Sequence, residues 1–393
     1  MKLFDNISRD YAGPAQYAEP KFGYYNRSAR QDIDKIRQLI ESWFTHYPAE
    51  HKKELYTKFR SSIDSQHYSA FFELFIHELL LQLGYSIIVH PDISGTERKP
   101  DFLATALGSM PFYIEATLAT DKSAEEIAKN ARMNEVYDAL NRMDSPNFFI
   151  EMEIIGAPKS PPSAKKIRSF LVKQLRVLDP DKIVSLWQVG GKEGVPHWRY
   201  EHDGWIVDFY PIPKSPKARG RPGSRPIGVL ADGEVHVLNS HDAIRDTIIS
   251  KANRYGEIDL PYVIAVNALG EHVENIDIMN ALFGQEQIVV NFGWSPKDYK
   301  ETRADNGAWR GPSGIQYTRV SAILIAHPLF PYNIPTAPIR LYHNPWAKRK
   351  YTSQLTQLPQ AVPEYSTNNT ITMPHKEGKS LAEIFNLSPE WPK

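Results

Sequence analysis

Residues 85–119, YSIIVHPDISGTERKPDFLATALGSMPFYIEATLA, decide the fold, because their apolar residues change from helical spacing to alternation. Segments 85–90, 101–106 and 111–119 have the composition and period of strands. The last two are joined by LGSMP, a good tight-turn sequence, so we expect a hairpin there. A hairpin places the start of its first strand beside the end of its second.

Further helices and strands are expected on both sides of residues 85–119. Apolar spacing and stop signals predict helices at 31–46, 49–60, 65–83, 123–143, 167–178 and 243–255. Period-two or continuous apolar runs predict strands at 147–156, 182–187, 205–211, 261–267 and 320–327. The order of elements predicts an α/β fold, with a mixed sheet flanked by helices.

The length of 393 residues is enough for two or three domains. We expect an N-terminal arm and helices at 1–64, a core at 65–156, an insertion with a basic loop at 157–242, a helix–strand unit at 243–330 and a Pro-rich C-terminal extension at 331–393. The helix–strand unit either completes the core sheet or belongs to a second domain.

Composition excludes several classes of function. The chain has 46 Lys and Arg against 46 Asp and Glu, so contact with nucleic acid would need a local basic patch. The absence of Cys excludes disulfides, thiolate zinc sites and a cysteine nucleophile. No apolar run approaches the roughly 18 residues that span a bilayer, and the first residues lack the apolar core of a signal peptide. We therefore expect no membrane segment and a cytoplasmic protein.

Three acidic residues are the candidates for chemistry. Glu73 lies in the expected helix 65–83, Asp101 opens a strand, and Glu115 lies within the next strand, where the hairpin lets it converge with Asp101. Carboxylates brought together repel each other unless a cation lies between them. Mg²⁺ binds one or two carboxylates together with water and phosphate oxygens, and it activates bound water for phosphodiester cleavage.

These residues resemble the PD-(D/E)xK nuclease superfamily, which has the restriction-endonuclease-like fold. The resemblance rests on Glu73 in a helix, PD at 100–101 and EAT at 115–117, and covers 65–156 at most. It implies a mixed sheet of that type, with a helical N-terminal region and a Pro-rich C-terminal extension. It also implies a Mg²⁺-dependent endonuclease, with Mn²⁺ as an alternative ion, that hydrolyses DNA in restriction or anti-phage defence. Asp101 and Glu115 would then be the metal ligands.

One position departs from that pattern. The family has Lys two residues after the second acid, and this chain has Thr117, whose hydroxyl orients water but carries no charge. The amine that stabilises the attacking water would have to come from Lys122, Lys129 or Lys251. Lys251 is the most attractive of the three if residues 261–267 form a strand of the same sheet. The departure leaves open a catalytically inactive DNA-binding or scaffold subunit of a larger complex.

The basic segment 214–225, KSPKARGRPGSR, is the candidate for contact with a nucleic-acid backbone, and a solvated insertion explains it equally well. Its candidate side chains are Lys217, Arg219, Arg221 and Arg225. Plain structural interpretations also exist for the acids: Glu73 can pair with His77, and Asp92 competes with Asp101 for the same role. A homo-oligomer and partner proteins of a defence system both remain open. No zinc, dinucleotide or P-loop motif is present.

Overall fold

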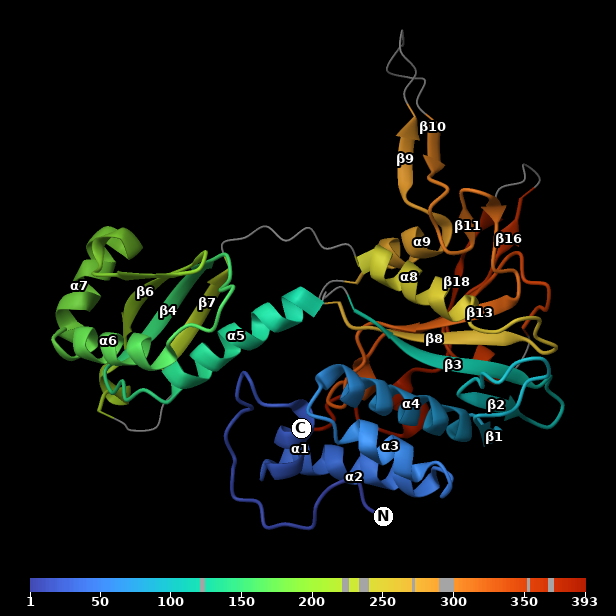
Figure 1. Ribbon diagram of the computed structural model, residues 1–393, viewed down its shortest axis with the longest axis horizontal. Coiled ribbons are helices and arrows are strands. Elements are labelled where there is room, and N and C mark those ends of the chain that lie inside the picture. Colours follow the sequence, from blue (N-terminus) through green and yellow to red (C-terminus); the bar gives the residue numbers. More distant parts are fainter. Residues whose placement is uncertain are drawn as a thin grey trace, which may run out of the picture. The chain divides into compact units, whose positions relative to one another are not determined.

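The computed structural model forms two compact units (Figure 1). It describes residues 1–120, 124–220, 226–232, 240–270, 273–289, 300–351, 354–366 and 371–393. Unit 1 comprises 1–13, 20–121 and 238–393, and unit 2 comprises 14–19 and 122–237. Unit 2 is therefore an insertion in the chain of unit 1.

Unit 1 is built on an eight-stranded mixed sheet. Its strands, in spatial order, are β1 (Ser86–Val89), β2 (Phe102–Thr105), β3 (Phe112–Ala119), β8 (Tyr262–Ala268), β13 (Val320–Ala326), β14 (Ile339–His343), β15 (Gln360–Ala361) and β18 (His375–Lys376). β8 runs parallel to both β3 and β13, and every residue of β8 and β13 is buried. Parallel strands at the centre of a sheet are covered on both faces, which explains their continuous apolar sequence.

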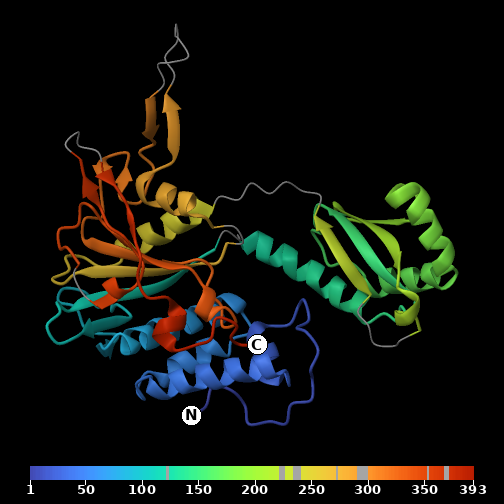
Figure 2. The ribbon, with the colours of Figure 1, turned by 180° about the vertical axis from the view of Figure 1, so that it is seen from behind.

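Helices cover both faces of this sheet (Figures 1 and 2). One face packs against α1 (Lys21–Arg27), α2 (Gln31–His46), α3 (Lys52–Phe59), α4 (Asp64–Gln82) and α10 (Leu381–Phe385). The other packs against α8 (Ser240–Ala252) and α9 (Asn275–Phe283). Alternation along β3 sends Ile114 into the first core and Tyr113 into the second. Short pairs complete the unit: β9 (Glu286–Val289) with β10 (Lys300–Arg303), β11 (Arg310–Gly311) with β12 (Gly314–Ile315), and β16 (Glu364–Tyr365) with β17 (Ile371–Thr372).

Unit 2 has its own four-stranded sheet and its own core. The strands, in spatial order, are β5 (Trp198–His202), β6 (Trp205–Pro213), β4 (Phe148–Ile155) and β7 (Ile227–Asp232). Apolar residues of α5 (Ala124–Asn141), α6 (Ala164–Arg176) and α7 (Pro180–Gly190) form one core with the buried residues of this sheet. Trp205 and Phe209 lie at the centre of that core and are fully buried.

The structure confirms an α/β fold with a large mixed sheet flanked by helices. It also confirms the hairpin, in which β2 and β3 are antiparallel and Phe102 pairs with Ile114. The segment 261–267 forms β8 beside β3, so the helix–strand unit that follows the insertion completes the sheet of unit 1.

Three expectations need correction. Residues 182–187 are not a strand but part of α7, because Asp179 caps that helix by accepting a hydrogen bond from the backbone N of Asp181, and Pro180 occupies its first position. Strand β4 pairs with β6 and β7, so residues 147–156 belong to the sheet of unit 2 and not to the expected core at 65–156. A helix followed by a strand does not specify which sheet the strand joins. The insertion starts at 122 rather than at 157.

Candidate active site

Glu115 is a carboxylate in the middle of the sheet of unit 1. It lies in β3, between β2 and β8, and only 1 % of it is exposed. Alternation along the strand places Glu115 on the side of the sheet that α8 covers. A buried carboxylate needs charged or hydrogen-bonding partners, and the end of α8 supplies them.

Three side chains surround the Glu115 carboxylate. The Nζ of Lys251, in the last turn of α8, donates a hydrogen bond to Oε1 of Glu115 at 2.7 Å. The Nη1 of Arg254 lies 3.2 Å from the same oxygen. The hydroxyl of Tyr255 donates a short hydrogen bond to Oε2 and also lies 2.9 Å from the carbonyl oxygen of Lys99. Both oxygens of Glu115 are therefore held in fixed directions.

Asp101 lies immediately before β2, beside Glu115. The pairing of Phe102 with Ile114 brings Asp101 alongside the next part of β3, where its Oδ2 accepts a hydrogen bond from the backbone N of Ala116 at 2.7 Å. Burial, followed by the charges of Glu115 and Glu73, raises the pKa of Asp101 well above its usual range. The charges of Glu115 and Glu73, two of the acids named from the sequence, therefore both act on the third, Asp101.

Glu73 approaches from the other side of the sheet, in α4. Its Oε1 accepts a hydrogen bond from the hydroxyl of Tyr47 at 2.7 Å, and the residue is nearly buried. Among the described residues, Glu73 forms no hydrogen bond with Asp101 or Glu115. Its expected partner His77 instead packs on Tyr47, with 4.8 Å between the ring centroids.

The other candidates occupy varied positions. Thr117 is half-buried in β3 and pairs with Val266 of β8, and Lys129 lies in α5 of unit 2. Lys122 lies outside the described residues. Asp92 pairs with Lys99 at 2.8 Å, and its side chain is 91 % exposed, which makes it a weak rival of Asp101.

The basic segment 214–225 is described only in part. Lys217 is exposed, whereas Arg219 pairs with Asp181 at 2.8 Å and donates to the carbonyl oxygen of Lys214. The candidates Arg221 and Arg225 lie outside the described residues. Part of the charge expected to be available for phosphate is therefore used within unit 2.

Sequence reasoning missed Arg254 and Tyr255. Their signal was that they follow Lys251 closely in the sequence, just beyond Ala252, where α8 ends. The backbone N of Arg254 donates a hydrogen bond to the carbonyl oxygen of Lys251 at 3.1 Å, and the next strand, β8, lies beside β3.

No group of three or more His, Asp or Glu side chains in the described ranges is arranged to hold a metal ion. The donor chemistry of the pair Asp101 and Glu115 nevertheless fits Mg²⁺ or Mn²⁺, because these ions take one or two carboxylates and complete their shell with water and phosphate oxygens. Burial raises the pKa of Asp101 most, and the charges of Glu115 and Glu73 raise it further; a divalent cation would offset the part that comes from these charges.

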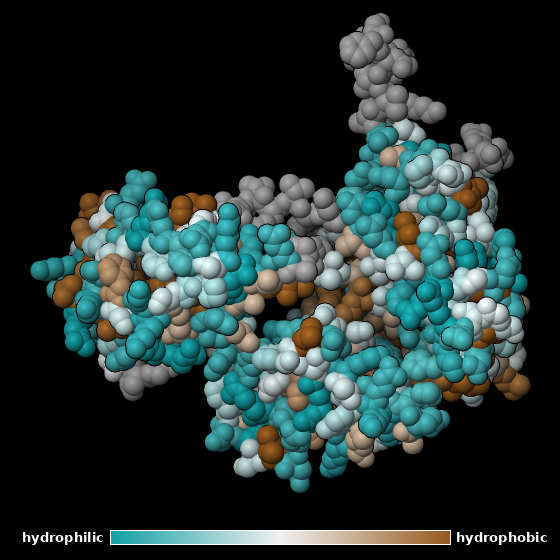
Figure 3. Space-filling model, in the orientation of Figure 1, coloured by the Kyte–Doolittle hydropathy of each residue, from teal (hydrophilic) through white to brown (hydrophobic). Residues whose placement is uncertain are grey.

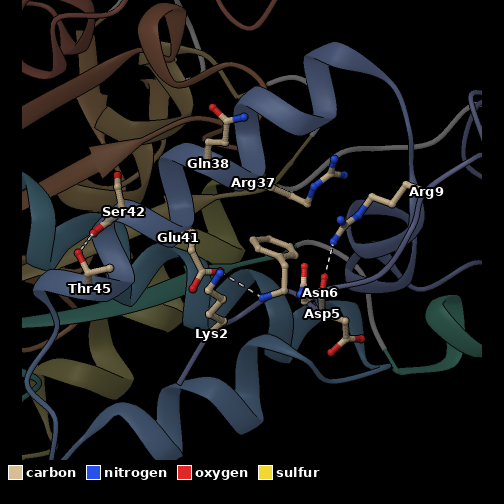
Figure 4. Close-up of a pocket in the computed structure, with 10 residues that line it drawn as sticks. Lys2, Asp5, Asn6, Arg9, Arg37, Gln38, Glu41, Ser42 and Thr45 are labelled. Carbon is tan, nitrogen blue, oxygen red and sulfur yellow. Dashed lines mark hydrogen bonds between the residues drawn. The ribbon is translucent and has the colours of Figure 1, made fainter.

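A groove of about 410 Å³ lies elsewhere, between the N-terminal residues and α2 (Figure 4). Arg9 in this groove donates to the backbone carbonyls of Asn26, Ile7 and Asp5. Glu41 accepts from the backbone N of Leu3 and Phe4. Arg9 and Glu41 therefore hold the N-terminal segment against α1 and α2. The groove is also lined by Lys2 and Asp5, but Glu41 is occupied by backbone groups of that segment.

Every helix in the described part of the chain is too short or too polar to cross a lipid bilayer. Comparisons with known protein families, with curated proteins and with solved structures find no match for this chain.

Proposed function

We propose that unit 1 is a metal-dependent nuclease that hydrolyses phosphodiester bonds of DNA. The observation that supports this most is the position of Lys251, whose Nζ is 2.7 Å from the buried Glu115 and whose charge acts on Asp101. An amine from α8 thus stands beside the acidic pair, where Thr117 provides none. The cluster has the two carboxylates and one lysine that this chemistry needs.

The chain's own residues would divide the work. Asp101 and Glu115 would hold Mg²⁺ or Mn²⁺, which when bound polarises the phosphate and lowers the pKa of a coordinated water. Lys251 orients the attacking water and stabilises the negative charge that develops on the phosphate. Tyr255 fixes the orientation of Glu115 through its hydrogen bond to Oε2.

Further residues support this arrangement. The side chain of Arg254 is 44 % exposed, so it can contact a substrate phosphate while still facing Glu115. Glu73, held by Tyr47, completes the site through a water or a second ion, and Thr117 helps to orient water. DNA as the substrate and a role in restriction or anti-phage defence in the cytoplasm come from the resemblance to PD-(D/E)xK nucleases.

A specific observation favours a second candidate, an inactive DNA-binding or scaffold subunit with the same site architecture. Both oxygens of Glu115 already have protein partners, and two of these partners are cations. A site neutralised in this way can persist for stability alone. The two candidates differ in whether the acids are needed for cleavage.

The test compares cleavage of plasmid and linear DNA by the full chain, with Mg²⁺ or Mn²⁺ and with EDTA. Glu115→Gln and Asp101→Asn keep the shape of each side chain and remove its charge, and each is expected to lower cleavage at least about a hundredfold. Two matched variants serve as controls: Glu201→Gln on the exposed side of β5 and Lys35→Met on α2, both expected to cleave like the wild type. Thermal unfolding shows whether each variant is folded.

Cleavage retained by both Glu115→Gln and Asp101→Asn would end the assignment of this site. A wild type that binds DNA but does not cleave it with either ion would favour the inactive subunit.

A further inference from the structure

Helix α6 of unit 2 carries an unusual concentration of positive charge. Five of its thirteen residues are Lys or Arg, and it contains no acidic residue. The acid-free stretch is longer than the helix, since no Asp or Glu occurs between Glu153 and Asp179. The chain as a whole has no net charge, so this charge is a local feature of one element.

The packing of α6 sorts its residues by chemistry. Ile167, Leu171 and Leu175 recur at every fourth position and are buried in the core of unit 2. The exposed side presents four cations around Ser169. We call the polar members of this exposed side the α6 strip, which consists of Lys165, Lys166, Ser169, Lys173 and Arg176; Phe170 is exposed beside them.

The cations of the α6 strip have no acidic partners. Within the described ranges, none of the four forms an ion pair or a side-chain hydrogen bond. Other cations of unit 2 do find partners: Arg199 pairs with Asp208 at 2.7 Å, and Lys192 contacts Glu151 at 2.5 Å. Like charges on one exposed side of a helix repel each other, which makes the strip a surface that gains from an external polyanion.

We infer that the α6 strip binds the phosphate backbone of duplex DNA. A helix of this length extends about 20 Å, and duplex DNA carries one charge per roughly 1.7 Å of its axis, so the strip faces several phosphates at once. Ser169, between the cations, adds a hydroxyl of the kind that contacts phosphate oxygens.

Other partners fit the strip less well. An amphipathic helix binds a membrane by inserting a continuous apolar side, and that side of α6, formed by Ile167, Leu171 and Leu175, is buried in the protein. Phe170 and the adjacent Val177 are exposed, and apolar residues on the face of unit 2 seen in Figure 3 are scattered among polar ones. Surfaces for single-stranded nucleic acid alternate cations with several aromatic platforms, whereas Phe170 is the one aromatic residue in α6. Duplex DNA needs neither feature.

This inference does not rest on the proposed cleavage, because it concerns unit 2 and its test runs without metal. The full chain is titrated into a short fluorescent DNA duplex of mixed sequence, in EDTA, at several salt concentrations, and anisotropy gives the affinity. The test variant replaces Lys165, Lys166, Lys173 and Arg176 by Gln. The control variant replaces four exposed lysines of unit 1 by Gln: Lys35, Lys53, Lys376 and Lys379.

The strip variant is expected to bind at least about tenfold more weakly at moderate salt, and the slope of log affinity against log salt should fall by about three. The control variant should match the wild type. A third variant, with Arg in place of the three lysines of the strip, keeps the charge and should keep the affinity.

Three results would overturn the inference. The strip variant could bind DNA as tightly as the wild type, or the strip and control variants could lose affinity equally. Vesicles of phosphatidylcholine and phosphatidylserine could also capture the wild type through the strip while DNA does not. All replaced side chains are exposed, so each variant is expected to fold, and circular dichroism checks this.

Discussion

Helices α6 and α8 both present cations, but in opposite environments. The side chain of Lys251, at the end of α8, is 18 % exposed and lies against a carboxylate that is almost wholly buried. The cations of the α6 strip face solvent with no acidic partner in the described structure. A charge pair away from water is strong and costly to break, whereas exposed charges act over a distance that salt controls. The two environments are therefore the basis of two separate proposals, catalysis at the end of α8 and DNA binding at α6.

The largest expected effect is on the kinetics of cleavage, where loss of Lys251 and loss of the α6 strip should change different constants. Lys251→Met is expected to lower kcat for DNA cleavage at least about a hundredfold, because it removes the charge that stabilises the transition state. Its affinity for DNA in EDTA should stay close to that of the wild type. The strip variant should keep the kcat of the wild type and bind DNA more weakly, so that its loss of cleavage disappears at saturating DNA. Steady-state kinetics with a fluorogenic duplex measures both, and a higher KM for Lys251→Met at unchanged kcat would contradict the assignment.

Stability should distinguish the two helices as well. Lys251→Met removes one partner of the buried Glu115 and is expected to lower the free energy of unfolding by about 3 kcal/mol. Lys166→Met, in the α6 strip, should give no measurable change, since that side chain is exposed and has no acidic partner. Urea unfolding of the two variants checks this, and equal midpoints would show that the buried pair contributes little.

The α8 side of this contrast could be predicted in part from the sequence, whereas the basic candidates named there lie at 214–225 and not in α6. The hairpin at 101–119 was enough to bring Asp101 and Glu115 together, because turn residues and strand period are local signals. The approach of Lys251 followed only under the condition that 261–267 joined the same sheet, since parallel pairing links residues far apart in the chain. Local patterns carry no information on such pairing, which also explains why β4 was assigned to the wrong sheet. Whether this cluster is catalytic stays a prediction.

Acid should affect the side of unit 1 around α4 and leave the charge of the strip unchanged. Burial lowers the pKa of His77 from its ordinary 6.5 to about 4. Between these two pH values the imidazole is protonated in the unfolded chain but neutral in the folded one. The free energy of unfolding is therefore highest above about pH 6.5 and falls as the pH approaches 4. His77 accounts for a decrease of about 2 kcal/mol between pH 7 and pH 5. His77→Phe should reduce this loss, as measured by urea unfolding at the two pH values. An unchanged pH dependence would show that His77 is not its source.

The smallest effect tests whether unit 2 can be weakened without touching its strip. Asp179→Ala removes the cap of α7 and is expected to destabilise unit 2 by about 1 kcal/mol. Asp179→Asn keeps a capping oxygen and should retain most of the stability of the wild type. Hydrogen exchange of α7 amides reports the change. DNA affinity at moderate salt should be unaffected in both variants, and a parallel loss of affinity would link α7 to the binding surface.

The chain leaves unit 1 after β3 and returns to it before α8, with all but six residues of unit 2 lying between. Glu115 and Lys251 are thus 136 positions apart in the chain, and nearly all of unit 2 lies between them in the sequence. The entropy of closing a loop grows slowly with its length, by about 0.6 kcal/mol for each doubling, so the size of the module hardly matters to the pair. Chimeras that replace unit 2 with a different folded domain should therefore assemble the same carboxylate–lysine pair, so that the connection between β3 and α8 accepts one folded module in place of another.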